Sequence, residues 1–287
     1  MKVGFIGFGT MGAPMAGHLL SAYGELHVWS RRAEQTASLR EKGAVVATAP
    51  QELASFCDAV VLCVNRTEDV QELAEELREG SKSGTLVIDH STISPHGAKE
   101  IEKRLREAGL RFVDAPITGG SMGAQSGQLT IFVGGSEKDC TDAIDVIKPY
   151  SKRAERVGGP GAGQMAKMAN QIAVAGMLIG LCECLSFADK AGLNLEQMRD
   201  MIGGGAGGSW GFPNYGPRIL ARDWSPGFSI KNQRKDFAYC REAAAEIGAR
   251  IPATQLVDDL LRVLQDEGRG EEATTALFEI LERPSAG

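Results

Sequence analysis

The chain has 287 residues, of which 43% are hydrophobic and 24% charged, and its formal net charge is −6. This length allows two domains with sizeable cores, and the acidic balance argues against a nucleic-acid-binding protein. The N-terminus lacks the pattern of a secretory signal. The most apolar run, Met168–Cys182, spans about 15 residues, fewer than the ~20 that cross a bilayer. We therefore expect a cytoplasmic protein with no membrane or nucleic-acid partner.

Four histidines and six cysteines limit the chemistry that the chain can carry. No two histidines have the spacing of metal ligands, and no cysteines form a Cys-x-x-Cys pair. We therefore expect no metal site, and reduced thiols that are mostly buried.

The first half of the chain alternates short β-branched runs with charged stretches of helical pattern. The expected strands are Lys2–Ile6, Glu25–Trp29, Ala44–Val46, Ala59–Val64, Thr85–Asp89, Arg111–Asp114 and Gln128–Gly134. The expected helices are Pro14–Leu20, Arg32–Lys42, Glu68–Glu79, Pro95–Ala108 and Glu137–Tyr150. This alternation predicts a doubly wound parallel sheet with right-handed crossovers.

The pattern changes at the glycine-rich segment Gly158–Gly163. After it, Gln164–Ala191 is expected to form one long helix, which is apolar on nearly all sides in its middle. Later helices are expected over Asn194–Ile202, Lys231–Ile247, Ala253–Glu267 and Glu271–Glu282, with little strand signal. We predict an α/β domain over residues 1–160 and an all-α domain over residues 161–287, with the long helix between them.

The first expected strand runs into a G-x-G-x-x-G turn. Its residues are Gly7, Phe8, Gly9, Thr10, Met11 and Gly12. In a Rossmann β-α-β unit the first glycine makes the turn, the second lets the backbone approach a pyrophosphate, and the third allows the helix to pack closely on the strand. The helix N-terminus then offers N–H donors to the phosphates. The context predicts a Rossmann domain that binds a dinucleotide.

The end of the second expected strand indicates which dinucleotide binds. NAD sites usually have Asp or Glu about 20 residues after the glycine turn, where it accepts hydrogen bonds from the ribose. This chain has Ser30, Arg31 and Arg32 there instead. No carboxylate repels a 2′-phosphate and two guanidinium groups can bind one, so the sequence favours NADP over NAD. In the alternative interpretation, the arginines only begin a surface helix.

Four blocks stand in order along the chain: Gly4–Gly12, Asp114–Gly120, Gly161–Asn170 and Lys235-Asp236. Together they resemble the β-hydroxyacid dehydrogenase family, which includes 3-hydroxyisobutyrate dehydrogenase, tartronate semialdehyde reductase and the glyoxylate and succinic semialdehyde reductases. The first block is shared by many dinucleotide enzymes, whereas the second and third together are specific. The resemblance extends along essentially the whole chain.

The resemblance implies that the second block is a substrate loop, which would bind the carboxylate of the substrate. The residues with this role are Thr118, Gly119 and Gly120. Successive small residues expose backbone N–H groups that bind anions, and threonine adds a hydroxyl donor. The family more often has Val and Ser where this chain has Ile117 and Thr118, and both changes are conservative.

The catalytic lysine of the family corresponds to Lys167. It stands among apolar residues on the long expected helix, where burial of an unpaired ammonium is costly. The family also has a substrate-holding amide near this lysine. Asn170 at i+3 and Gln171 at i+4 both fit, and the sequence leaves the choice open.

The resemblance assigns further residues to the cofactor pocket. They are Val64 and Asn65 after the fourth strand, Thr92 after the fifth, and Lys235 in the last block. The first three fit a parallel sheet, since such sheets bind ligands at the carboxyl ends of their strands. His90, close to Thr92, is interpreted as a packing residue rather than a catalyst.

These residues predict an NADP-dependent oxidoreductase that interconverts a small β-hydroxy acid, or a related 2-hydroxy acid, with its aldehyde or semialdehyde. Lys167 would be the general acid in reduction and the base in oxidation. One alternative is an imine reductase, which shares the architecture and cofactor but usually has Asp or Tyr at the lysine position. Another is a non-catalytic, dehydrogenase-like binding module, which lacks the lysine and carries extra domains for which this chain has no room.

Substrate identity and assembly are less constrained. The segment Gly203–Pro217 is expected to approach the substrate, but it does not discriminate between glyoxylate and succinic, tartronate or methylmalonate semialdehyde. The apolar perimeter of the long helix is too large for one small helical domain to cover. This predicts a homodimer or homotetramer.

Overall fold

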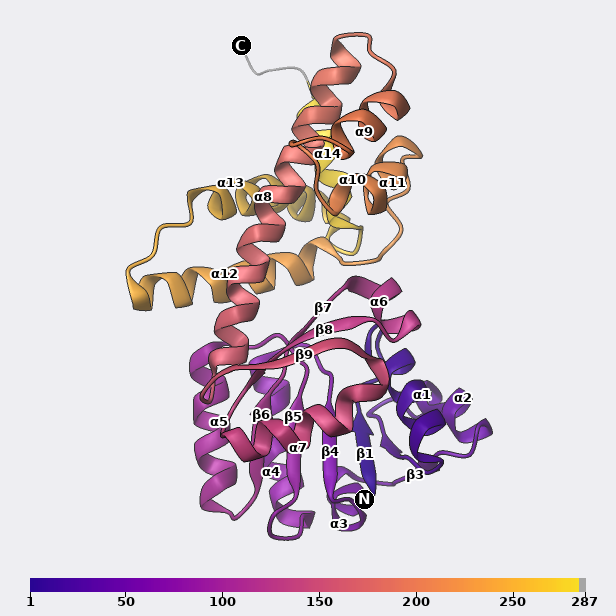
Figure 1. The fold of residues 1–287 in the computed structure, drawn as a ribbon, viewed down its shortest axis with the longest axis vertical. Helices are drawn as coiled ribbons and strands as arrows, with labels where there is room; N and C mark the ends of the chain where they lie inside the picture. Colours follow the sequence, from indigo (N-terminus) through magenta and orange to yellow (C-terminus); the bar gives the residue numbers. More distant parts are fainter. Residues whose placement is uncertain (284–287) are drawn as a thin grey trace. The chain divides into compact units, whose positions relative to one another are not determined.

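The structure is a computed structural model that describes residues 1–283. The chain forms two compact units, Met1–Lys167 and Met168–Gly287, which divide inside the long helix α8 (Ala162–Lys190). The first unit is an α/β domain of the Rossmann type and the second is helical (Figure 1). The predicted fold class is thereby confirmed.

One sheet forms the centre of the first unit (Figure 1). Its strands are β1 (Val3–Ile6), β2 (His27–Trp29), β3 (Val45–Val46), β4 (Ala59–Leu62), β5 (Leu86–Asp89), β6 (Arg111–Asp114), β7 (Ile117–Thr118), β8 (Leu129–Gly134) and β9 (Ser151–Gly158). Their order is β3-β2-β1-β4-β5-β6-β8-β7, and β9 pairs with β8. The strand order reverses at β1, which lies between β2 and β4, and doubly wound sheets bind ligands at this switch point.

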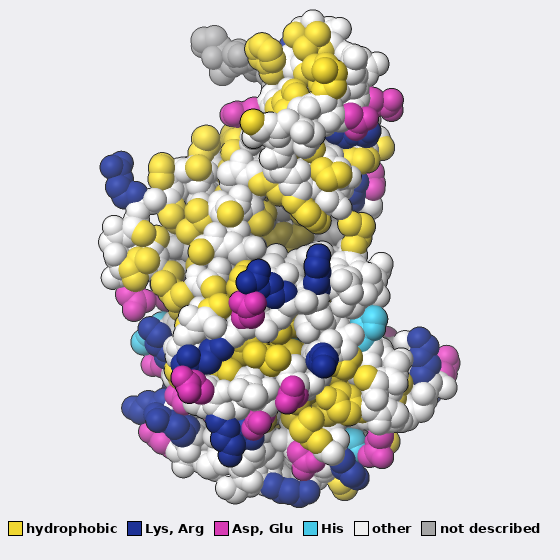
Figure 2. All heavy atoms as spheres, viewed as in Figure 1, with side chains coloured by type: hydrophobic (Ala, Val, Ile, Leu, Met, Phe, Trp, Pro, Cys, Tyr) yellow, Lys and Arg dark blue, Asp and Glu magenta, His cyan; other side chains and the backbone are white. Residues whose placement is uncertain are grey.

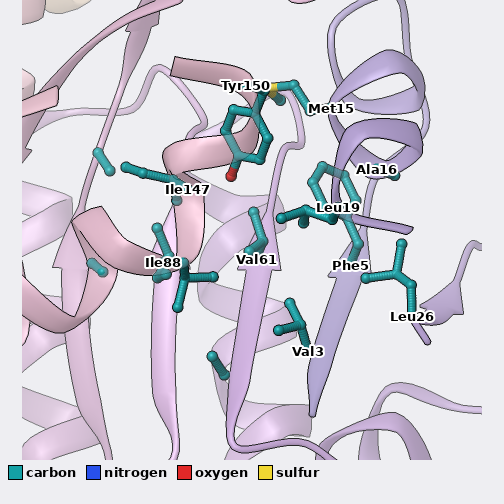
Figure 3. Close-up of a cluster of buried hydrophobic side chains, with 14 of the residues drawn as sticks. Val3, Phe5, Met15, Ala16, Leu19, Leu26, Val61, Ile88, Ile147 and Tyr150 are labelled. Atoms are coloured by element: carbon teal, nitrogen blue, oxygen red, sulfur yellow. The ribbon is translucent and has the colours of Figure 1, made fainter. Parts of the chain in front are cut away.

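Helices cover both faces of this sheet. The core on one face includes residues from α1 (Gly12–Tyr23), α6 (Gly120–Ser126) and α7 (Glu137–Ile147), and that on the other includes residues from α3 (Pro50–Phe56), α4 (Thr67–Gly80) and α5 (Pro95–Glu107). Successive strand residues serve opposite cores, as Phe5 and Ile6 of β1 do. Figure 3 shows the first core, where Phe5 lies beside Leu19 of α1.

The structure corrects the prediction at one edge of the sheet. Strand β8 runs antiparallel to both β6 and β7, so the sheet is parallel only in part. The sequence did not predict β7, β9, α3 or α6. Strand β9 is half-exposed or exposed along its whole length, so its sequence has no apolar alternation to reveal it. The expected helix at residues 32–42 is a 3₁₀ turn, Ala33–Thr36, followed by the short α2 (Ala37–Glu41).

Within the described residues, the second unit continues α8 with helices and no named strand. They are α9 (Leu195–Gly203), α10 (Gly211–Asn214), α11 (Gly216–Leu220), α12 (Ile230–Ile247), α13 (Pro252–Leu264) and α14 (Leu277–Glu282). The last helix is shorter than predicted, because a 3₁₀ turn occupies Thr274–Ala276. It is anchored by side chains: Trp224 Nε1 donates to Glu279 Oε1 at 2.7 Å, and Lys190 Nζ donates to the Leu281 carbonyl at 2.9 Å.

Helix α8 is long and apolar enough, by length and composition alone, to cross a membrane, with a mean hydropathy of 1.7 in its most apolar stretch. The helix has 29 residues and so extends well beyond the apolar run seen in the sequence. Half of that stretch is buried inside the protein. Core helices of globular proteins have the same character, so the composition alone is weak evidence for a membrane span.

Candidate active site

The glycine turn between β1 and α1 places its three glycines in different surroundings. Gly7 has a φ of +103°, and a Cβ there would lie 2.2 Å from the Cys63 carbonyl oxygen. A Cβ on Gly12 would lie 1.9 Å from the Gly7 carbonyl oxygen. In contrast, a Cβ on Gly9 would meet no heavy atom of residues 1–283 within 4 Å. The fold itself requires Gly7 and Gly12, whereas the open space at Gly9 fits the approach of a pyrophosphate.

The other side chains of the turn face different surroundings. Phe8 is 6% exposed, and its ring centroid lies 5.6 Å from that of Phe5 in the core. Its side chain therefore belongs to the core, and only its backbone is placed to meet a cofactor. Thr10 is exposed and Met11 half-buried.

Ser30, Arg31 and Arg32 lie together after β2, with both arginines exposed. The Arg31 guanidinium is engaged by α4: its Nη1 lies 3.3 Å from Asp69 Oδ1 and its Nη2 lies 2.6 Å from Glu72 Oε2. A 2′-phosphate at this position would compete with two carboxylates for Arg31.

The ends of β4 and β5 are tied to each other and to α8. Val64 N donates to Ser91 Oγ at 2.9 Å. The buried Gln164 of α8 donates from Nε2 to the Ser91 carbonyl at 2.8 Å. These bonds fix the loop that carries the half-buried Thr92, while Asn65 is exposed beside Val64.

His90 is a buried structural residue. Its Nδ1 lies 2.6 Å from the Ala115 carbonyl, and its Nε2 lies 2.7 Å from the Tyr150 hydroxyl. A carbonyl only accepts hydrogen bonds, so Nδ1 carries the proton and Nε2 accepts from the tyrosine. Burial lowers the pKa of His90 to about 4, which keeps the ring neutral. The interpretation of His90 as a packing residue agrees with this geometry.

The loop that the resemblance implies binds substrate contains two consecutive glycines with positive φ. Gly119 and Gly120 both have positive φ, of +128° and +64°. Backbone N–H groups of small residues in turns can form anion-binding concavities, so this conformation is compatible with the expected carboxylate site. Thr118, which precedes them at the end of β7, is half-buried.

Asp114 is the first residue of this loop and is completely buried. Its Oδ1 accepts from Gly161 N and its Oδ2 from Gln164 N, both at 2.8 Å, so it caps the first turn of α8. Burial raises the pKa of Asp114 to about 7, and the neighbouring Asp89 contributes, although the backbone N–H groups favour the charged form.

This pKa predicts a pH dependence of stability. The pKa of Asp114 is higher in the folded than in the unfolded state, so its stabilising contribution is complete below pH ~4 and is lost as the pH rises through 7. Between about pH 5.5 and 8.5, we expect the free energy of unfolding to fall by about 2 kcal/mol relative to that of Asp114→Asn. Denaturant titrations of both proteins over this range measure the difference, and a constant difference would contradict the prediction.

Lys167 is 8% exposed, and its Nζ donates to the Ile117 carbonyl at 2.8 Å. That carbonyl belongs to the loop that is expected to bind substrate, next to Thr118. The candidate catalytic lysine is therefore hydrogen-bonded to the candidate substrate loop.

In the second unit, three of the expected site residues form one linked group. Gln171 Nε2 donates to Asp236 Oδ2 at 2.8 Å, and Asn170 Nδ2 donates to Gln171 Oε1 at 2.9 Å. Lys235 Nζ lies 3.1 Å from Asp236 Oδ1 and 5.2 Å from the centroid of the Tyr239 ring. The buried Asp236 thus joins Gln171 of α8 to Lys235 of α12.

The sequence did not single out Asp114, Gln164 or Asp236, although each lies in a block that carries the resemblance. Asp114 and Gln164 are polar residues within largely apolar stretches, which is a usable signal, whereas Asp236 follows a run of polar and charged residues and gives no such signal. Among the described residues, no group of three or more His, Cys, Asp or Glu side chains could hold a metal.

Two family descriptions match the chain. Residues 2–159 match the NAD binding domain of 6-phosphogluconate dehydrogenase. Residues 161–281 match the family described as NAD-binding of NADP-dependent 3-hydroxyisobutyrate dehydrogenase.

Known proteins are similar to the chain over nearly its whole length. A 3-hydroxyisobutyrate dehydrogenase-like protein of Arabidopsis thaliana is 36% identical over 286 residues, which cover 98% of this chain and 85% of that protein. The 2-hydroxy-3-oxopropionate reductase of Escherichia coli is 33% identical over 287 residues, which cover 98% and 97% of the two chains. The solved structure of Mycobacterium tuberculosis 3-hydroxyisobutyrate dehydrogenase with L-serine has a TM-score of 0.89 at 27% identity, and the match covers 98% of this chain and 99% of that one.

Proposed function

Because the chain belongs to the β-hydroxyacid dehydrogenase family and is an NAD(P)-dependent oxidoreductase, we propose that it interconverts a small β-hydroxy acid, or a related 2-hydroxy acid, with its aldehyde or semialdehyde, using NADP(H). One observation carries this proposal. Lys167 is buried on α8, and its Nζ donates to the Ile117 carbonyl in the loop expected to bind substrate. A buried ammonium bonded to such a loop is placed to exchange a proton with a bound carbonyl compound.

The residues have distinct roles in the reduction. Bound NADPH supplies the hydride that adds to the carbonyl carbon. Protonated Lys167 donates a proton to the carbonyl oxygen as negative charge develops there. Thr118 and the N–H groups of Gly119 and Gly120 bind the carboxylate and so orient the carbonyl. In the oxidation, neutral Lys167 accepts the proton of the hydroxyl.

Of the two candidate amides, Asn170 is assigned to the substrate. The Gln171 amide donates to Asp236 from its nitrogen and accepts from Asn170 at its oxygen, and the residue is 3% exposed. Asn170 is half-buried and donates one N–H to Gln171. Gln171 then acts by orienting Asn170, and Asp236 by orienting Gln171.

The direct test is reduction of an aldehyde panel. Glyoxylate and succinic, tartronate and methylmalonate semialdehydes are each mixed with NADPH and the enzyme, and the loss of NADPH absorbance is followed. We expect at least one to be reduced by the wild type, and much more slowly by Lys167→Ala. Reduction of a cyclic imine but of no aldehyde would overturn the proposal in favour of an imine reductase.

Arg31 is proposed to select NADPH over NADH. A charge-assisted contact with the 2′-phosphate is worth ~1.5–3 kcal/mol, or ~10–150-fold. Because Asp69 and Glu72 already engage Arg31, we expect the lower end of this range. Arg31→Ala should remove most of the preference for NADPH in kcat/KM. Arg78→Ala is the control and should leave this preference unchanged, because it removes an exposed arginine that pairs with Glu75 within α4. Equal kcat/KM for the two cofactors in the wild type would contradict this assignment.

We also propose a homodimer or homotetramer that associates through α8. In the second unit, the exposed positions of α8 recur every three or four residues and form a stripe: Ala169, Ala173, Gly176, Gly180, Glu183 and Phe187. A Cβ on Gly176 or Gly180 would have no heavy atom of the described chain within 4 Å, yet glycine inside a helix costs about 1 kcal/mol relative to alanine. Phe187 is 75% exposed, and Figure 2 shows further hydrophobic side chains at the surface of the helical unit. Packing within the described chain therefore does not account for these glycines, and close contact with a second copy would.

Sedimentation tests this assembly. At micromolar concentration, the wild type should have a mass that is a multiple of 30.5 kDa. Gly176→Glu should fold, because the space around it is open within the described residues, and should shift the protein toward the monomer. Gly17→Glu on α1, where the space is also open, is the matched control and should not dissociate the assembly. A wild-type mass near that of one chain would refute the proposal.

A further inference from the structure

Hydrogen bonds at two places join the segment Asp114–Gly120 to the start of α8. At the first, the Asp114 carboxylate accepts from Gly161 N and Gln164 N, each at 2.8 Å. At the second, three residues further along both segments, Lys167 Nζ donates to the Ile117 carbonyl at 2.8 Å. Asp114 therefore holds the first turn of the helix, and the lysine one turn later bonds back to the loop that begins at Asp114.

The backbones are in direct contact where these segments meet. A Cβ on Gly163 would lie 2.5 Å from the Asp114 carbonyl oxygen and 2.6 Å from that of Phe132. A Cβ on Gly134 would lie 2.5 Å from Asp114 Oδ1 and 2.5 Å from Gly163 N. Both glycines are needed for the carboxylate to reach the helix, so α8 has little freedom to shift on β6 and β8.

We propose that Asp114 is a positioning residue for the reaction, because its carboxylate fixes the start of α8 on the substrate loop and so sets the place of the Lys167 ammonium. This inference rests on the proposed function, in which Lys167 is the general acid. Asp114 is completely buried and acts only through the helix that it caps. A displacement of about 1 Å in a reacting group can cost 10²-fold in rate, so loosening this cap is expected to slow proton transfer.

A double-mutant cycle separates this role from a merely structural one. In Asp114→Asn, the amide NH₂ cannot accept, so at most one of Gly161 N and Gln164 N keeps its acceptor. We expect Asp114→Asn to lower kcat by roughly 10–100-fold when Lys167 is present, but by less than about threefold in a Lys167→Ala background. The Kd of NADPH should change less than about threefold in either background, because the glycine turn on β1 is unaltered.

Asp142→Asn is the matched control. Asp142 of α7 pairs with Arg111 at the opposite end of β6, so it also ties this strand to a helix. Its effect on kcat should be small and the same in both backgrounds. If Asp114→Asn does not fold, Asp114→Ser, which is smaller and retains one acceptor, takes its place in the cycle.

The outcomes distinguish this inference from the proposed function. If Lys167→Ala is impaired but Asp114→Asn has the same effect in both backgrounds, Asp114 is only structural and the inference alone is wrong. Wild-type kcat in Asp114→Asn would also overturn it. Wild-type kcat in Lys167→Ala would overturn the proposed function, and the inference with it.

Discussion

Gly12→Ala is expected to destabilise the N-terminal unit by about 3 kcal/mol or more, and to abolish detectable cofactor binding. The added methyl carbon would lie 1.9 Å from the Gly7 carbonyl oxygen, which is backbone and cannot rotate away. Either α1 moves off β1 or the turn opens. Both changes displace the N–H groups at the start of α1 that are expected to face the phosphates.

Gly9→Ala is the informative partner of this variant. The space around Gly9 is open in residues 1–283, and its φ is not in the left-handed region, so stability should stay within about 0.5 kcal/mol of the wild type. The methyl group would stand where the pyrophosphate approaches the backbone. We therefore expect NADPH affinity to fall by roughly 10–150-fold, the value of one charge-assisted hydrogen bond.

Thermal denaturation and NADPH fluorescence titration of the two variants separate these effects. Gly12→Ala should lose both stability and binding, while Gly9→Ala should lose binding alone. Equal binding of NADPH by Gly9→Ala and the wild type would mean that the cofactor does not approach this turn.

The sequence predicted well what depends on local pattern. Strands β4 and β5 are buried, β-branched runs, and their positions follow from hydrophobicity alone. Strand β9 is half-buried or exposed along its whole length, so its residues carry no apolar pattern. The antiparallel direction of β8 also depends on long-range pairing, which local sequence does not encode.

In the candidate site, too, local motifs were predictable and long-range contacts were not. The glycine turn was identified because its spacing has a direct geometric meaning, and the structure gives Gly7, Gly9 and Gly12 three different surroundings. The bonds of Asp114 to α8 were not predicted, since they join residues about 50 positions apart. The proposed assignment of Asn170, rather than Gln171, to the substrate likewise depends on Asp236, which is on another helix.

Lys167→Ala should lower kcat by ~10²–10⁴-fold on the best aldehyde, the usual cost of removing a general acid. NADPH affinity should stay within a few-fold, because the glycine turn and the end of β2 are unaltered. Lys167→Ala should also have two opposing effects on the stability of the fold. The substitution removes a buried ammonium, which is costly to bury, but it also removes the donor to the Ile117 carbonyl. These effects oppose each other, so we expect the free energy of unfolding to change by about 1 kcal/mol or less.

Two further substitutions test whether proton transfer is what is lost. Lys167→Arg keeps a positive charge but should also fail, because a guanidinium does not readily release its proton. Lys167→Met keeps most of the side-chain volume and should fold even if the alanine variant does not. Lys190→Ala, at the exposed end of the same helix, should leave kcat unchanged. If Lys167→Ala or Lys167→Met keeps near-wild-type kcat, the proton comes from another group. If neither folds, Lys167 is a structural residue, because its bond to Ile117 would then hold the loop on the helix rather than serve the reaction.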